Sequence, residues 1–272
     1  MKDILEEIIA CKYKEIENLR QIVKEDILCD NCLAQRPRRS MRKALVSVPY
    51  GIIAEFKRKS PSKGWIKKEG RSDIIPPDYE RNGASALSIL TDTPFFGGSL
   101  HDIATARPLT KRPILRKDFI IDEYQLYQTR IIGADAVLLI AAALDTEKCH
   151  ALAEKAHELG LEVLLEIHTA EELPFINKEI DMVGINNRNL GTFFTDVENS
   201  FRLAGQLPRN TVLVSESGIS DPQTVKRLRN AGFRGFLIGE TFMKTEQPGK
   251  KLEEFINESN PVTHSHDKFT TE

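Results

Sequence analysis

A glutamate and a lysine lie two residues apart at the end of an apolar segment that begins at Gly51. The segment opens with β-branched residues, which predicts a buried strand, and a Ser-Pro-Ser-Lys-Gly turn follows it. Because strand side chains alternate between two faces, Glu55 and Lys57 must share one face. Charges on a buried strand are costly unless they are paired. This pair is therefore the first indication of an active site.

Polar residues also follow five other apolar segments, at the points where strands are expected to end. They are Lys117, Glu166, Asn186 with Arg188, Ser217 with Gly218, and Gly239 with Glu240. A single charge at such a point is usually a solvated rim residue. If these ends meet at one opening, however, the lysines and glutamates would shift one another's pKa values. A general acid and a general base could then coexist near neutral pH.

Two glycines and an aromatic pair indicate the kind of ligand. Gly218 and Gly239 follow the last two apolar segments, and a glycine lets backbone N–H groups approach an anion closely. Each glycine alone would be an ordinary turn residue, but the pair predicts a phosphorylated substrate. Of Phe95 and Phe96, we expect one to pack in the core and the other to form a wall for an aromatic or apolar ligand.

Short apolar segments alternate with amphipathic ones along most of the chain, which predicts repeated strand and helix units. The expected strands are residues 51–57, 85–90, 113–118, 135–140, 161–167, 181–186, 211–216 and 234–239. Among the helices between them, three are expected to begin at the N-cap residues Asp145, Thr195 and Asp221. Eight such units predict an α/β fold, a closed (β/α)8 TIM barrel with its chemistry at the C-terminal strand ends. The alternative, a doubly wound sheet, usually carries a G-x-G-x-x-G turn that Ser60–Gly64 does not match.

Three regions are expected along the chain. Residues 1–48 carry apolar positions at helical spacing among many charges, which predicts an N-terminal helical extension. Residues 49–258 are expected to form the catalytic barrel. Residues 259–272 form a polar C-terminal tail, in which we interpret His264 and His266 as part of a frayed end rather than a metal site.

The composition argues against several classes of partner. The 272 residues contain 38 Lys and Arg against 40 Asp and Glu, so a net charge of −2 favours neither nucleic acid nor a membrane surface. No segment reaches roughly 18 consecutive apolar residues and no signal peptide is recognisable, so we expect a cytoplasmic protein. Cys29 and Cys32 form a C-x-x-C without a second pair, and we interpret them as reduced thiols. We expect neither a metal nor a cofactor.

The ordered motifs resemble those of one family, the indole-3-glycerol phosphate synthases of tryptophan biosynthesis. The matching blocks are Glu55–Gly64, Leu90–Asp92, Phe95–Ser99, Leu115–Ile120, Leu165–His168, Gly184–Leu190, Val214–Ile219 and Leu237–Glu240. They occur in family order, and a helical leader is also typical of this family. The resemblance implies the substrate 1-(2-carboxyphenylamino)-1-deoxyribulose 5-phosphate, whose ring closes with loss of carbon dioxide and water to give indole-3-glycerol phosphate.

The resemblance also implies roles for individual side chains. Lys117 resembles the general acid that protonates the ketone oxygen, and Glu166 resembles the acid/base group of the dehydration. Glu55 would position the sugar hydroxyls and hold Lys57, which would supply positive charge to anionic groups. Asn186 resembles the residue that hydrogen-bonds the sugar chain.

Other residues resemble those that hold the two anionic ends of the substrate. Arg188 would face the anthranilate carboxylate, which a guanidinium can bind through two hydrogen bonds. The phosphate site is matched by Ser217, Gly218, Gly239 and Glu240, and the pocket wall by Ser60, Phe96 and Phe119. Glu240 stands where some relatives have a small hydroxyl residue, so its side chain is expected to turn away and leave its backbone N–H to bind. Gly97 stands where relatives carry Asn, which removes one polar contact.

Two other functions fit part of the pattern. Lys117 or Lys57 could form a Schiff base with a sugar-phosphate ketone, as in an aldolase. A non-catalytic barrel that binds a sugar phosphate is the second alternative, because a fold alone implies no chemistry. Such a binder would have no reason to keep the full set of carboxylates and lysines. Association with other enzymes of the tryptophan pathway is not readable from the sequence.

Overall fold

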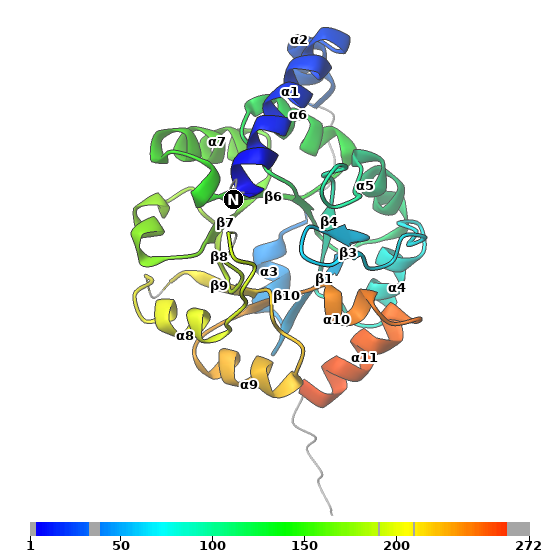
Figure 1. The fold of residues 1–272 in the computed structure, drawn as a ribbon, viewed down its shortest axis with the longest axis vertical. Helices are drawn as coiled ribbons and strands as arrows, with labels where there is room; N and C mark the ends of the chain where they lie inside the picture. The colour runs from blue at the N-terminus through cyan, green and yellow to red at the C-terminus, as the bar shows by residue number, and fades with distance from the viewer. Residues whose placement is uncertain (1–3, 33–38, 190, 209, 260–272) are drawn as a thin grey trace, which may run out of the picture.

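The computed structural model describes residues 4–32, 39–189, 191–208 and 210–259. In this part of the chain eight parallel strands close into a barrel, because β1 pairs with both β10 and β4 (Figure 1). The barrel strands are β1 (Gly51–Phe56), β4 (Ala86–Leu90), β5 (Ile114–Lys117), β6 (Ala136–Ile140), β7 (Glu162–Ile167), β8 (Met182–Asn186), β9 (Val212–Glu216) and β10 (Gly235–Ile238). Each lies within one residue of its predicted ends. The TIM barrel is confirmed, and the doubly wound sheet is wrong because an open sheet would leave two unpaired edges.

Helices surround the barrel between successive strands (Figure 1). They are α4 (Ile75–Arg81), α5 (Leu100–Ala106), α6 (Glu123–Ile132), α7 (Thr146–Glu158), α8 (Glu198–Ala204), α9 (Pro222–Asn230), α10 (Glu240–Met243) and α11 (Pro248–Ser259), with 3-10 turns at η1 (Arg107–Leu109), η2 (Ala141–Ala143) and η3 (Ala170–Phe175). Asp145 and Asp221 cap α7 and α9 as predicted, each accepting a backbone N–H of the first turn. After β1, the short strands β2 (Lys59–Ser60) and β3 (Gly64–Trp65) form a small hairpin.

The predicted cap at Thr195 is wrong. Helix α8 begins at Glu198, and Asp196 Oδ1 accepts the backbone N–H of Glu198 at 3.0 Å. Thr195 instead forms an isolated antiparallel bridge with Arg188, whose Nε donates to the threonine Oγ1 at 3.3 Å. The hydroxyl that would have capped the helix is therefore engaged by the loop after β8.

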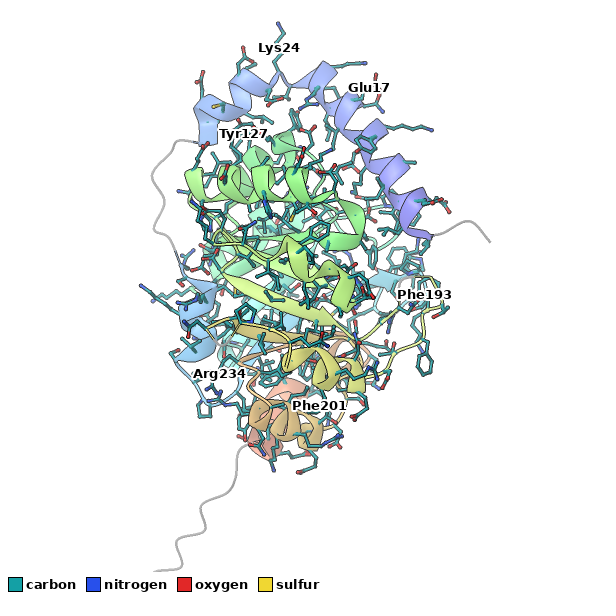
Figure 2. The ribbon with its side chains drawn as sticks, turned by 90° about the vertical axis from the view of Figure 1, so that its left-hand side faces the viewer. Glu17, Lys24, Tyr127, Phe193, Phe201 and Arg234 are labelled. Atoms are coloured by element: carbon teal, nitrogen blue, oxygen red, sulfur yellow. The ribbon has the colours of Figure 1, made fainter. Side chains whose placement is uncertain are left out.

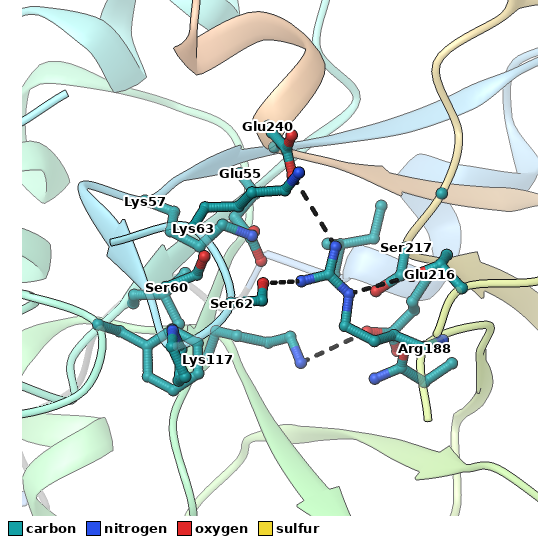
Figure 3. A pocket seen from close by; sticks show the side chains of 18 of the residues that line it. Glu55, Lys57, Ser60, Ser62, Lys63, Lys117, Arg188, Glu216, Ser217 and Glu240 are labelled. Carbon is teal, nitrogen blue, oxygen red and sulfur yellow. Dashed lines mark hydrogen bonds and ion pairs between the residues drawn. The ribbon is translucent and has the colours of Figure 1, made fainter. Parts of the chain in front are cut away.

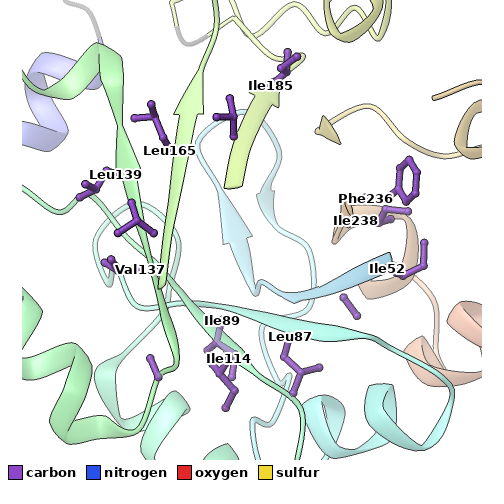
Figure 4. Packing of buried hydrophobic residues seen from close by; sticks show 14 of the residues in the cluster. Ile52, Leu87, Ile89, Ile114, Val137, Leu139, Leu165, Ile185, Phe236 and Ile238 are labelled. Atoms are coloured by element: carbon purple, nitrogen blue, oxygen red, sulfur yellow. The ribbon is translucent and has the colours of Figure 1, made fainter. Parts of the chain in front are cut away.

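The side chains of each barrel strand divide between two cores. In β1, Ile52, Ala54 and Phe56 point outward and pack with the surrounding helices, whereas Ile53 points into the barrel. Figure 4 shows the outward-facing side chains of several strands, which form one continuous layer beneath the helices. The predicted alternation in β1 is confirmed. Because both faces are buried, the strands are almost uniformly apolar except where they reach the cavity.

The N-terminal extension packs against both ends of the barrel. It consists of α1 (Ile4–Ile22), α2 (Glu25–Cys32) and α3 (Met41–Val46). Met41 and Leu45 of α3 fill the end where the strands begin, and Leu5 and Ile8 of α1 join the same interior cluster from the other end. Figure 1 shows α1, in blue, reaching from α2 toward the middle of the barrel, and Figure 2 shows Glu17 and Lys24 on the outer side of the segment formed by α1 and α2.

The predicted boundary at residues 48 and 49 falls between α3 and β1, and that at 258 and 259 falls at the end of α11. The tail with His264 and His266 lies outside the described residues. Cys29 is a free thiol, whereas the side chain of Cys32 is not described. None of the described helices has both the length and the apolar composition that a bilayer span requires.

Candidate active site

A cavity of about 630 Å³ opens at the C-terminal ends of the barrel strands (Figure 3). Every site residue predicted from the sequence lines it, and together they come from seven strand ends and their loops. They are Glu55, Lys57, Ser60, Phe96, Lys117, Phe119, Glu166, Asn186, Arg188, Ser217, Gly218, Gly239 and Glu240. The barrel thus brings together side chains that are up to 185 positions apart in the chain.

Lys117 lies at the centre of a buried cluster of carboxylates. Its Nζ is 2.7 Å from Glu166 Oε2 and 3.4 Å from Glu216 Oε2 (Figure 3). Burial alone would lower the pKa of Lys117, but the charges of Glu166, Glu216 and Glu55 outweigh it and raise the pKa above its ordinary value. Lys117 is therefore held as an ammonium group that can donate a proton.

Glu166 is held by three groups. Besides Lys117, Asn186 Nδ2 donates to Glu166 Oε1 at 2.9 Å, and His168 Nε2 lies 3.4 Å from the same oxygen. Burial would raise the pKa of Glu166, but Lys117 and His168 lower it well below its ordinary range. Glu166 is consequently an ionised carboxylate before the substrate binds.

Glu55 and Lys57 form the predicted pair on the inner face of β1. Lys57 Nζ is 2.6 Å from Glu55 Oε1, and Ser88 Oγ donates to Glu55 Oε2 at 3.4 Å. Gly239 makes room for this carboxylate, since a Cβ at that position would lie 2.5 Å from Glu55 Oε1. The pair forms the side of the cavity next to β10.

Arg188 reaches across the mouth of the cavity. Its Nη1 donates to Ser62 Oγ at 2.8 Å, which links the loop after β8 to the hairpin after β1 (Figure 3). Glu240 Oε2 lies 3.8 Å from Arg188 Nη2. The Glu240 carboxylate is thus directed toward Arg188 at the mouth, and its expected turn away from the phosphate stays a prediction.

The turn after β9 has an unusual backbone. Ser217 and the following Gly218 both adopt left-handed conformations, with φ of 67° and 75°. A Cβ on Gly218 would lie 2.6 Å from Thr195 Cγ2, so the loops after β8 and β9 approach closely at this point. Such a non-glycine outlier is typical of a site where loop geometry serves function.

Apolar side chains line another part of the cavity. The centroids of the Phe96 and Phe119 rings are 6.0 Å apart, and Leu5 and Ile8 of α1 add to this apolar wall. Of the Phe95 and Phe96 pair, Phe96 is the one that lines the cavity. The contribution of α1 has no local signal in the sequence, because its apolar residues look like those of any amphipathic helix.

A family model described as "Indole-3-glycerol phosphate synthase" matches residues 5–255. The chain belongs to this family. A relative of that name from Bacteroides thetaiotaomicron is 71% identical over 256 residues, covering 94% of this chain and 98% of the relative. One from Polaromonas naphthalenivorans is 40% identical over 272 residues, covering 95% of this chain and 100% of the relative. The solved structure of 3-hexulose-6-phosphate synthase from Salmonella typhimurium has a TM-score of 0.60 at 13% identity, covering 77% of this chain and 100% of that one, which supports the fold alone.

Glu216 belongs to the buried carboxylate cluster around Lys117. The site predicted from the sequence did not include it. Burial raises its pKa to about 8; Lys117 opposes this rise, whereas Glu166 and Glu55 add to it. Strand parity could have identified Glu216, because Val212 and Val214 on the same strand both point into the barrel. His168, to which the sequence assigned no role, likewise contacts Glu166, and its two neighbouring glutamates raise its pKa to about 9 despite burial.

Replacing Gly184 with alanine is expected to damage this cluster. A Cβ at position 184 would lie 2.1 Å from Glu216 Oε1, so Glu216 would have to move away from Lys117. Overpacking of this kind typically costs about 1–3 kcal/mol, and we expect synthase activity to fall about tenfold. Denaturant unfolding and a turnover assay measure the two effects. Gly205→Ala is the matched control, because nothing lies within 4 Å of that Cβ, and equal effects at both positions would contradict the prediction.

The raised pKa of Glu216 also predicts how stability depends on pH. Between pH 4.5 and about 8, the folded chain retains a proton on Glu216 that the unfolded chain releases. This contribution to stability is complete below pH 4.5 and is lost as the pH rises through 8. As the pH rises through this window, the free energy of unfolding should therefore fall less for Glu216→Gln than for the wild type. The two decreases should differ by more than about 1 kcal/mol. Denaturant titrations at several pH values test this, and parallel curves for the two proteins would count against it.

Proposed function

We propose that the chain converts 1-(2-carboxyphenylamino)-1-deoxyribulose 5-phosphate to indole-3-glycerol phosphate, with release of carbon dioxide and water. The observation that carries this proposal is the contact of 2.7 Å between Lys117 and Glu166 inside the cavity. A protonated lysine beside an ionised glutamate suits a reaction that needs a proton delivered in one step and removed in a later one. Membership of the synthase family supports the same reaction.

Lys117 acts as the general acid of ring closure. The aryl carbon that bears the carboxyl group attacks the ketone carbon, and the ketone oxygen takes a proton from Lys117 Nζ. The carboxyl group then leaves as carbon dioxide, and the electrons of the broken bond restore the aromatic ring. Because the neighbouring carboxylates raise the pKa of Lys117, the proton is in place before the substrate binds.

Glu166 acts in the dehydration that follows. The hydroxyl formed from the ketone must leave as water, and a proton must leave the new ring. Glu166 accepts the ring proton and passes it to the departing hydroxyl, which leaves as water. Its contacts with Lys117 and Asn186 keep it ionised and oriented for this transfer. Glu55 positions the sugar hydroxyls and holds Lys57, whose charge faces the anionic groups of the substrate.

The two ends of the substrate are held by different loops. Arg188 binds the anthranilate carboxylate, exchanging its hydrogen bond with Ser62 for a stronger, charge-assisted one. The phosphate binds to backbone N–H groups around Ser217, Gly218, Gly239 and Glu240, where the left-handed turn opens the backbone toward the cavity. Phe96 and Phe119 form the wall for the aromatic ring.

The ion pairs argue against the Schiff-base alternative. A lysine must be a neutral amine to attack a ketone. The raised pKa of Lys117 keeps it protonated, and Lys57 Nζ is engaged in a 2.6 Å ion pair with Glu55. Acid/base chemistry is therefore the better account of both lysines.

An assay for product formation tests the proposal. Purified protein with the carboxyphenylamino sugar phosphate should develop the fluorescence of the indole product, and the same rate should be observed in the presence of a metal chelator. Absence of product would overturn the proposed function. Loss of activity with chelator, and its recovery with added metal, would overturn the acid/base mechanism without metal.

A further inference from the structure

Lys12 of α1 is a charged residue buried on the face of the helix that meets the barrel. Its side chain is 1% exposed, and its Nζ lies 3.1 Å from Asp92 Oδ2 and 3.2 Å from Asp118 Oδ1. Glu15, one turn further along α1, is 2.9 Å from the same Nζ. A lysine is rarely buried to this extent unless it is paired, so Lys12 and its carboxylates fix the position of this turn of α1 against the barrel.

The two aspartates organise the loops that carry the aromatic wall. Asp92 follows β4, and its Oδ1 accepts the backbone N–H groups of Phe95 at 2.8 Å and Phe96 at 3.1 Å. Asp118 follows Lys117, and its Oδ1 accepts the backbone N–H of Phe119 at 2.9 Å. The carboxylates that bind Lys12 therefore also set the positions of Phe96 and Phe119.

The buried charges at this junction balance. Arg116 Nη2 lies 2.9 Å from Asp118 Oδ2, so Lys12 and Arg116 together match Asp92 and Asp118. Burial would raise the pKa of Asp118, but the charges of Arg116 and Lys12 lower it instead. Removing Lys12 would leave a net negative charge in a buried site, directly beside the loop segment that begins with Lys117.

We propose that Lys12 is a positioning residue for substrate binding: it ties α1 to the loops after β4 and β5, so that Leu5 and Ile8 complete a wall with Phe96 and Phe119. This wall receives the apolar aromatic part of the substrate, whereas the proton transfers are carried out by Lys117 and Glu166. The inference rests on the proposed function for its kinetic test. Its structural half, the docking of α1 through Lys12, can be measured without any substrate.

The test compares Lys12→Met with Lys14→Met, which removes the same charge from an exposed position of the same helix. We expect Lys12→Met to raise KM about tenfold or more with kcat changed less than about threefold, because the acid/base groups stay in place. Amide hydrogen exchange of residues 4–22 should become faster, while that of the barrel strands stays unchanged. Lys14→Met should match the wild type in both measurements.

A second variant separates positioning from general stability. Lys12→Met/Asp92→Asn removes one carboxylate with the lysine, and an asparagine Oδ1 can still accept the N–H groups of Phe95 and Phe96. We expect this variant to regain thermal stability but to keep the raised KM and the fast exchange of α1. It also serves if Lys12→Met alone does not fold.

Two results would overturn the inference: a KM for Lys12→Met equal to that of Lys14→Met, or a normal KM in the double variant. Failure of the proposed function is recognised separately, because wild type and Lys14→Met would then form no indole product. In that case the exchange measurement decides, and unchanged exchange of residues 4–22 in Lys12→Met would refute the docking role.

Discussion

Replacing Lys117 with alanine is expected to lower kcat by about 10²–10⁴-fold, the usual contribution of a general acid, with a much smaller change in KM. Lys117 is the cation closest to Glu166 and Glu216 in the described cavity, so no neighbouring ammonium group takes over its position. The indole product is measured by fluorescence under saturating substrate. Single-turnover experiments show whether the slow step is ring closure.

The appropriate control for this variant is Lys14→Ala, an exposed lysine on α1 far from the carboxylate cluster. Circular dichroism should give the same secondary structure for both proteins, because the buried barrel strands do not depend on Lys117 for their pairing. If Lys117→Ala retained turnover close to that of Lys14→Ala, the assignment of the general acid would be wrong.

Glu166→Gln is expected to lower kcat by about 10²–10³-fold, because an amide of the same size can accept no proton from the substrate. The change also removes the nearest negative charge from Lys117, so the raised pKa of that lysine should fall toward its ordinary value. The residual activity should therefore be lost at a lower alkaline pH than in the wild type. Profiles of kcat against pH measure both effects.

Glu158→Gln supplies the comparison, because Glu158 is an exposed carboxylate on α7 that pairs only with the nearby Lys155 among the described residues. A Glu166→Gln enzyme with a kcat within about threefold of this control would remove Glu166 from the mechanism. An unchanged alkaline limit would show instead that Glu166 does not control the protonation of Lys117.

Much of the fold was predictable because its signals are local. Each barrel strand is a short apolar segment, and each strand-to-helix unit forces a right-handed parallel crossover, so eight units imply closure. The capping residues Asp145 and Asp221 act within their own helices, and both were identified. Thr195 was misassigned because the loop after β8 folds back on itself, so that Arg188 donates to the threonine hydroxyl and the helix begins only at Glu198.

The site was predictable for a different reason. In a barrel all C-terminal strand ends meet at one opening, so polar residues at those ends must lie close together. This convergence can be predicted without knowing any distance. Glu216 was omitted although the alternation of side chains along its strand places it inside the barrel. The sequence contained the information needed to include it. The orientation of Glu240 could not be predicted, because it depends on the position of Arg188 across the mouth of the cavity.

The sequence by itself determined the barrel, the family and thirteen of the residues that line the cavity, because strand periodicity and family motifs are read from neighbouring residues. Only the tertiary structure decided how these charges pair. It showed that Lys117 lies between Glu166 and Glu216, that Glu216 carries a raised pKa, and that Lys12 joins α1 to Asp92 and Asp118. Such pairings depend on distances between segments remote in the chain, and burial sets their strength, so no local pattern contains them.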